Sequence, residues 1–315
     1  MAVQTAPTTP RPVDAGALQR AARRIASAPE VPWLHAEVAR RMAGRIDLLT
    51  RKPQRLAVWW PHPAEDPAPL QAACRGATRV AVRPEFAGTL AGEDRWPSGL
   101  LGGLGRLLGR APLPSVPEAE VEAARFDLVW ANMMLHGVAD PQPLIARWHR
   151  ALAVDGCLMF STLGPGTLPE LRHLFAEQGW GQPLAPLVDM HDLGDMLVRA
   201  GFADPVMDQE SITLTWPDAS AALLELRSLG RNADPGRFAG LRTPGWKRRL
   251  VQALDDMASR RADGRVALTF EVAYGHAWRV APRVRGPSEV TVDLETLRAT
   301  ARSHPPRPPH PTGAG

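Results

Sequence analysis

Residues 126–160, FDLVWANMMLHGVADPQPLIARWHRALAVDGCLMF, decide the fold. The apolar run at 126–130 predicts a buried strand, and the pair Asp140-Pro141 is typical of the start of a helix. Asp155-Gly156 is expected to end that helix, and residues 157–160 predict a second buried strand. A strand, a helix and a strand at this spacing indicate two parallel strands joined by a crossover helix.

The chain upstream repeats this pattern. Residues 55–60 and 78–82 predict buried strands, and a helix at 69–76 is expected between them. A further helix is predicted at 34–49, because apolar side chains recur there every four residues. Alternating strands and helices predict an α/β fold with a doubly wound, mostly parallel sheet.

The chain downstream adds helices and an antiparallel edge. Thr167 and Glu170 have the spacing of a capping box, and Asp192 is expected to cap a helix that ends at Gly201. Two helices and two long strands complete the prediction, at 218–230, 244–260, 205–216 and 265–278. The two strands are predicted to form the antiparallel edge of the sheet.

One domain is predicted, at residues 17–298, between disordered tails at 1–16 and 299–315. Both tails are rich in proline and poor in the apolar residues that a core needs. Residues 87–118 are interpreted as a flexible surface insertion or a poor amphipathic helix, with no assigned role.

Composition excludes several function classes. The 37 basic and 33 acidic residues are interspersed, so no clustered nucleic-acid footprint is expected. No apolar run is long enough to span a membrane, and no secretory leader is recognised. The 2 cysteines and the scattered histidines have no metal-ligand spacing, and we expect a reduced, cytoplasmic protein.

Several stretches carry a family resemblance. Residues 126–175 resemble the second half of class I S-adenosylmethionine-dependent methyltransferases, and more narrowly the biotin-pathway malonyl-acyl-carrier-protein O-methyltransferases. The stretches VDMHDLGDMLVRAGF (188–202), LRSLGRNA (226–233) and GRVALTFEVAYGHAW (264–278) extend the similarity. The mitochondrial complex I assembly methyltransferase-like proteins, one of which is an arginine hydroxylase, look similar over the same region and at 285–297.

The resemblance implies a Rossmann-like fold that binds S-adenosylmethionine at the turn after the first strand. The family turn resembles D-x-G-x-G-x-G, whereas this chain has Val58 for the acidic residue and non-glycine residues at the three glycine positions, Trp60, His62 and Ala64. Arg83 stands near the position of the ribose-binding carboxylate, and Glu85 follows it. The cofactor residues implied by the resemblance are thus this degenerate loop together with Glu85 and Asn132.

The candidate catalytic residues are Asn132, His136 and His191. Asn132 and His136 follow a parallel strand at its carboxyl end, where doubly wound folds place ligands. A histidine there can act as a general base or bind an acceptor carboxylate, and the alternative is a polar turn bonded to backbone. His191 either orients substrate or belongs to a helix cap.

The acceptor side is expected to involve Arg227, Tyr274 and His276. Arg227 pairs with an acyl-carrier protein or its phosphopantetheine in this interpretation, and the alternative is a solvated helix face. His276 either lines an acceptor pocket or packs in the core. The resemblance implies carboxyl O-methylation of a carrier-bound malonyl thioester. The alternatives are a degenerate pseudo-methyltransferase acting as a binding or assembly module, and an assembly-factor or arginine-hydroxylase-like role.

Overall fold

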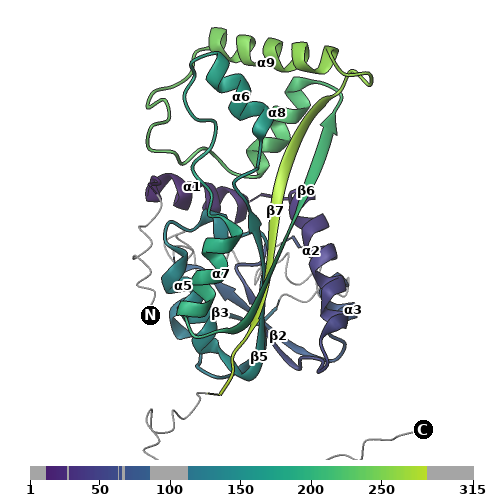
Figure 1. Cartoon of the computed structure of the whole chain (residues 1–315), viewed down its shortest axis with the longest axis vertical. Helices are drawn as coiled ribbons and strands as arrows, with labels where there is room; N and C mark the ends of the chain where they lie inside the picture. The colour runs from purple at the N-terminus through teal and green to yellow at the C-terminus, as the bar shows by residue number, and fades with distance from the viewer. Residues whose placement is uncertain (1–11, 27, 63, 66–67, 86–112, 282–315) are drawn as a thin grey trace, which may run out of the picture. The chain divides into compact units, whose positions relative to one another are not determined.

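The computed structural model describes residues 12–26, 28–62, 64–65, 68–85 and 113–281 (Figure 1). The described residues from 12 to 280 belong to one compact unit. Its first helix, α1 (Ala15–Ala26), was not predicted and begins inside the expected N-terminal tail. The predicted C-terminal tail and residues 285–297 lie outside the described residues, as do residues 87–112 of the predicted insertion.

Seven strands form one sheet in the described chain, in the order β3-β2-β1-β4-β5-β7-β6. The parallel strands are β1 (Arg55–Trp59), β2 (Thr78–Arg83), β3 (Ser115–Pro117), β4 (Phe126–Ala131) and β5 (Leu152–Leu163). The antiparallel edge consists of β7 (Val266–Trp278) and β6 (Ala203–Trp216). The predicted mostly parallel α/β sheet with an antiparallel C-terminal edge is therefore confirmed.

Helices cover both faces of this sheet (Figure 1). On one face lie α2 (Trp33–Arg45), its continuation η1 (Ile46–Leu48) and α3 (Ala68–Ala73). On the other lie α5 (Pro141–Ala151) and α7 (Met190–Arg199), and the far part of the β6–β7 pair carries α6 (Pro169–Glu177), α8 (Ala219–Ser228) and α9 (Pro244–Ser259). Alternate residues of a strand face opposite cores: Val58 packs toward α2, and Trp59 packs with α5.

Three local predictions were wrong. Helix α5 ends at Ala151, and β5 begins at the next residue, upstream of Asp155-Gly156. Short strand β3 and the 3₁₀ helix η3 (Glu118–Glu120) lie in the predicted insertion. The cap of α7 is Asp189, whose side chain accepts a hydrogen bond from the His191 backbone, and Asp192 lies in the first turn.

The predicted capping box was also wrong, because its two polar side chains form hydrogen bonds with β7 instead. Thr167 donates its hydroxyl proton to the Glu271 carbonyl, and the Glu170 carboxylate accepts from the backbone and hydroxyl of Thr269. The cap position of α6 is Leu168, with a left-handed φ of 56°. Pro169 begins the helix one residue after the capping-box spacing expects.

Gly275 of β7 gives a first prediction, because a Cβ there would lie 2.2 Å from the Phe160 ring. We expect Gly275→Ala to lower the free energy of unfolding by about 1–3 kcal/mol through overpacking. Gly44, in α2, has nothing within 4 Å of such a Cβ. Gly44→Ala is therefore the matched control and should raise stability by about 0.5–1 kcal/mol, since alanine favours the helix. Urea unfolding of both variants measures the two changes, and equal changes would contradict the packing argument.

Candidate functional site

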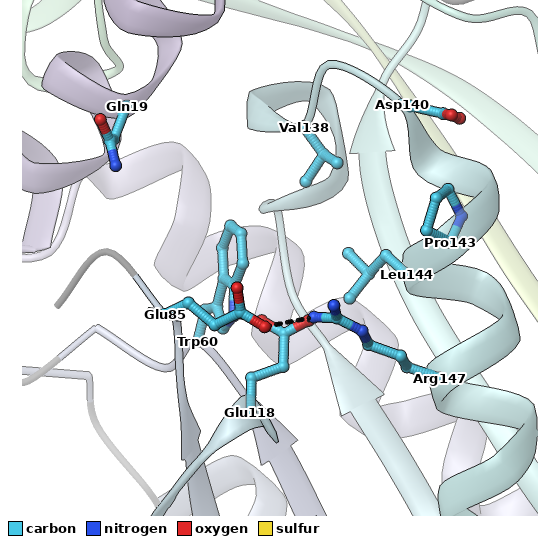
Figure 2. Close-up of a pocket in the computed structure, with 9 residues that line it drawn as sticks. All are labelled: Gln19, Trp60, Glu85, Glu118, Val138, Asp140, Pro143, Leu144 and Arg147. Atoms are coloured by element: carbon cyan, nitrogen blue, oxygen red, sulfur yellow. Dashed lines mark hydrogen bonds and ion pairs between the residues drawn. The ribbon is translucent and has the colours of Figure 1, made fainter. Parts of the chain in front are cut away.

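A pocket of about 290 Å³ opens at the carboxyl ends of the first parallel strands. Doubly wound sheets bind their ligands at this edge. Figure 2 shows the side chains around it, which come from α1, the ends of β1 and β2, η3 and the β4–α5 region. The lining residues are Gln19, Trp60, Glu85, Glu118, Val138, Asp140, Pro143, Leu144 and Arg147. We call this pocket the crevice.

Trp60 lies in the turn directly after β1, and its backbone has a left-handed φ of 48°. Such a conformation suits glycine and costs other residues about 1–2 kcal/mol. The turn thus keeps the backbone shape of a glycine position while carrying a tryptophan. The Trp60 amide donates to the Val82 carbonyl at 2.9 Å, and the indole Nε1 donates to Glu118 Oε2 at 2.9 Å.

Glu118 is the buried anchor of the crevice, with only 4% of its surface exposed. Its other carboxylate oxygen lies 2.7 Å from Arg147 Nη1, which also reaches Glu85 Oε1 at 2.9 Å. Helix α5 presents Arg147 to both carboxylates, as Figure 2 shows. A buried carboxylate needs such partners, because an unpaired charge is costly away from water.

A polar cluster lies beside the crevice at the end of β4. The Asn132 amide donates to the His35 carbonyl at 2.9 Å and accepts from the Ser161 hydroxyl at 3.0 Å. The ring of His136, in η4 (Leu135–Gly137), stands edge to face with that of His35 at 6.4 Å between centroids. Burial lowers the pKa of His35 to about 3, so this imidazole is neutral at physiological pH.

The loop after Trp60 adds two groups to this cluster. His62 is buried, its Nδ1 accepts from the Ala64 backbone at 3.1 Å, and burial lowers its pKa. Glu65 hydrogen-bonds to Asn132, and burial raises the pKa of its carboxyl group to about 7. A neutral carboxylic acid is thus favoured in the cluster below neutral pH.

Glu65 gives a prediction of pH dependence. Its pKa of about 7 in the folded protein lies above the ordinary value of 4.5, so its favourable contribution is full below pH 4.5 and is lost as the pH rises through 7. We expect Glu65→Gln to be more stable than the wild type at pH 8.5 by roughly 1–3 kcal/mol, and equal to it near pH 4.5. Thermal melts across this range measure the difference. Exposed Glu120 provides the control Glu120→Gln, and identical pH profiles of the two variants would contradict the assignment.

The structure brings only some of the predicted cofactor residues together. Trp60 and Glu85 line the crevice, whereas the Val58 side chain packs in the core facing α2. His62 and Asn132 belong to the neighbouring polar cluster. Ala64 is exposed in the same loop.

The other predicted site residues lie outside the crevice lining. His191 is exposed, and its ring Nδ1 lies 2.7 Å from Oδ1 of Asp189, the cap residue of α7. This contact agrees with the alternative prediction that His191 belongs to a helix cap. Arg227 is exposed near the end of α8. His276 pairs in register with Met159 and contacts the Trp278 ring edge to face at 5.0 Å.

Tyr274 belongs to a separate charged network between α2 and the β6–β7 pair. Its hydroxyl donates to Glu210, and this contact together with burial raises its pKa. Arg41 pairs with Glu210 and with Glu37. Hydrogen bonds from Arg40 and then Arg41 lower the pKa of Glu37 to about 2. The Arg45 guanidinium lies 4.0 Å from the centroid of the tyrosine ring. This network ties α2 to the antiparallel edge.

Four functional candidates were missed from the sequence: His35, Glu65, Glu118 and Arg147. Glu118 follows a strand of only three residues, SVP, which is too short for an alternation signal. Glu65 lies among prolines and His35 on an otherwise apolar helix face. The available signal for Glu118 was its place directly after a parallel strand, because doubly wound sheets bind ligands at the carboxyl ends of such strands.

No helix in the described ranges is long and apolar enough to cross a membrane. No group of three or more His, Cys, Asp or Glu side chains within those ranges is arranged to hold a metal ion.

The residues of the crevice do not fit S-adenosylmethionine as they stand. The Trp60 side chain forms part of the crevice wall, and both Glu85 and Glu118 are paired with Arg147. Pro61 has no amide to donate in the turn. The remaining volume of about 290 Å³ lies at the lower limit of the roughly 300–1,000 Å³ typical of ligand pockets.

Comparison with known proteins identifies the relatives of this chain. A family profile described as "Methyltransferase domain" matches residues 113–160, from β3 into β5. The malonyl-[acyl-carrier protein] O-methyltransferase of Laribacter hongkongensis is 38% identical over 84% of this chain and 88% of its own length. The malonyl-[acyl-carrier protein] O-methyltransferase of Gallionella capsiferriformans is 36% identical over 86% of this chain and 93% of its own length. Among solved structures, the YcgJ protein of Bacillus subtilis has a TM-score of 0.49 at 10% identity, covering 76% of this chain and 99% of that one.

The sheet order and the profile match define the class of protein, a Rossmann-like class I methyltransferase domain. The whole-length similarity is more specific than the class. The chain belongs to the malonyl-[acyl-carrier protein] O-methyltransferase family. The predicted family is therefore confirmed.

Proposed function

We propose that this chain is a carboxyl O-methyltransferase that takes a methyl group from S-adenosylmethionine and methylates a malonyl thioester carried by an acyl-carrier protein. The observation that carries the proposal is the 38% identity over 84% of the chain to a protein of that activity. The position of the crevice, at the strand ends where this class of fold binds ligands, supports it.

Carboxyl methylation makes modest demands on the acceptor side of the protein. The acceptor carboxylate is already a nucleophile, so no strong general base is required, and alignment of the reacting groups supplies most of the acceleration. Asn132 suits a positioning role, because both ends of its amide are held by His35 and Ser161. No step through the methyl donor is derived from the crevice, since its residues do not fit that molecule.

Two measurements test the proposed function on the full chain. The first is calorimetric titration with S-adenosylmethionine, and the second is mass spectrometry of malonyl-acyl-carrier protein after incubation with enzyme and donor. Binding together with a gain of one methyl group is the expected result. Failure of both in a folded sample would overturn the proposal.

A second candidate function is a non-catalytic binding or assembly module. The hydrogen bond from Trp60 to Glu118 favours it, because that contact occupies the crevice with the chain's own side chains. Binding of the carrier protein without any methylated product supports this candidate. A methylated product excludes it.

The partner surface that we propose is the basic segment, residues 237–249. It contains five basic side chains and no acidic one. Lys247, Arg248 and Arg249 are exposed, and none of them forms an ion pair with a described residue. Leu241 is 97% exposed beside them. A basic surface with three arginine and lysine side chains free of ion pairs to described residues and an exposed apolar side chain complements an acidic carrier protein.

The basic segment is connected to the crevice through α1. Arg237, at its start, pairs with Asp14 at 2.5 Å, and the Asp14 amide donates to the Ala233 carbonyl at 2.8 Å. Helix α1 follows Asp14 and brings Gln19 to the crevice. Helix α1 therefore connects the start of the basic segment to the crevice.

A cytoplasmic location is part of the proposal. Both cysteines, Cys74 and Cys157, are buried and unpaired in disulfides, and burial raises their pKa values to about 11 and about 12. Such protonated thiols are unreactive and suit a reducing compartment.

A further inference from the structure

Glu118 links Trp60 and Arg147 through its two carboxylate oxygens at the crevice (Figure 2). The indole of Trp60 donates to one oxygen of Glu118, and Arg147 binds the other oxygen. Each member comes from a different element: the turn after β1, η3 and α5. We call these three residues the crevice plug.

We propose that the crevice plug controls which ligands enter, by making the Trp60 indole compete with a nucleoside-sized ligand for the same space and for the Glu118 carboxylate. The indole is a planar aromatic group with one N–H donor, and an aminopurine base is likewise planar and aromatic with N–H donors at its edge. The indole therefore supplies one oxygen of the Glu118 carboxylate with a hydrogen-bond donor from the chain itself.

The backbone of Trp60 supports this assignment. A tryptophan in a left-handed conformation is unfavourable unless its side chain gains contacts that hold it there. The indole donates to Glu118, and the Trp60 side chain lines the crevice. The strain of the turn and the filling of the crevice are thus parts of one arrangement.

Arg147 gives the plug a second contact. Its guanidinium bridges buried Glu118 and the more exposed Glu85, whose side chain is 57% exposed. A ligand donor that binds Glu118 competes with the indole for one oxygen and with Arg147 for the other. Entry of such a ligand therefore involves release of the indole, of the guanidinium, or of both.

The test compares calorimetric titrations of S-adenosylmethionine into the wild type, Trp60→Gly and a control. We expect Trp60→Gly to bind at least about tenfold more tightly, because displacing the indole costs a charge-assisted hydrogen bond in the wild type. Glycine also suits the left-handed turn, which favours folding of the variant. Trp33, which is 52% exposed on α2, supplies the control Trp33→Ala, with unchanged affinity expected.

Trp60→Phe provides a second variant that keeps an aromatic ring but removes the donor to Glu118. We expect a smaller gain of about threefold, and thermal melts verify that each variant is folded. Unchanged or weaker affinity in both variants overturns the plug, and so does the absence of binding to any folded variant.

The role of the crevice plug rests on the proposed function only for the choice of ligand. Different experimental outcomes overturn the plug and the proposed function. A wild type that forms methylated product, with no gain in either Trp60 variant, overturns the plug alone. Tight binding by Trp60→Gly with no product from the wild type upholds the plug and overturns the proposed activity.

Discussion

Reversal of charge at Arg248 and Arg249 is expected to weaken binding of the acyl-carrier protein by at least about tenfold, because both side chains belong to the proposed docking surface. Both are exposed on α9 and lack ion-pair partners among the described residues. The double variant Arg248→Glu/Arg249→Glu changes the surface charge without touching the core. Its free energy of unfolding should therefore stay within about 0.5 kcal/mol of the wild type.

The matched control reverses two exposed arginines at the opposite edge of the sheet. Arg51 precedes β1 and Arg75 precedes β2, so both lie near the amino ends of the parallel strands. Arg51→Glu/Arg75→Glu produces the same change in net charge and should leave carrier binding nearly unchanged. Biolayer interferometry with purified malonyl-acyl-carrier protein measures both variants. Equal weakening by the two variants would show that net charge, and not the basic segment, attracts the partner.

Salt separates the proposed contact from a general apolar attraction. Exposed charges are screened over about 8 Å at physiological ionic strength. The affinity of the wild type should therefore fall as salt is raised, and that of Arg248→Glu/Arg249→Glu should change less. A wild-type affinity that does not respond to salt would assign the docking energy to Leu241 and its neighbours instead.

The parallel part of the fold could be predicted because its strands are buried on both faces. Such strands appear in the sequence as continuous apolar runs, as in β1, β4 and the second half of β5. The register and the crossovers follow once these runs alternate with helices. The antiparallel edge was predicted for a different reason, because β6 alternates exposed and buried side chains.

The crevice could be predicted only as a place, not as an arrangement of side chains. The loss of the glycine pattern at Trp60 was visible in the sequence, but its partner Glu118 lies 58 residues further on. Arg147 lies another 29 residues beyond Glu118, on a helix whose sequence pattern shows only its apolar face. Contacts between residues so far apart in the sequence form only when three elements meet at one edge of the sheet. A local sequence pattern cannot predict that meeting.

Errors at helix starts had a related cause. Capping rules describe a helix in isolation, and Thr167 and Glu170 have the correct spacing for a capping box. In the folded chain both side chains hydrogen-bond to β7 instead of to the end of α6. Tertiary partners therefore determined the outcome, and Leu168 adopted the strained cap position.

Substitution of Trp148 by alanine should lower the free energy of unfolding by about 3–5 kcal/mol, since this side chain is fully buried between α5 and the sheet. Its ring contacts Trp59 edge to face at 6.3 Å and lies 5.9 Å from Phe160. A loss of this size is a large part of the roughly 5–15 kcal/mol that stabilises a typical domain. Trp33→Ala, at an exposed position, should cost less than about 1 kcal/mol.

Phenylalanine at position 148 should behave differently from alanine. The indole nitrogens of Trp148 and Trp59 are both buried without a hydrogen-bond partner in the described structure. Trp148→Phe keeps the aromatic packing and removes one unsatisfied donor, so its cost should stay near 1 kcal/mol. Urea unfolding of the three variants measures these differences. If phenylalanine cost as much as alanine, the indole N–H would have to make a stabilising contact, contrary to the structure.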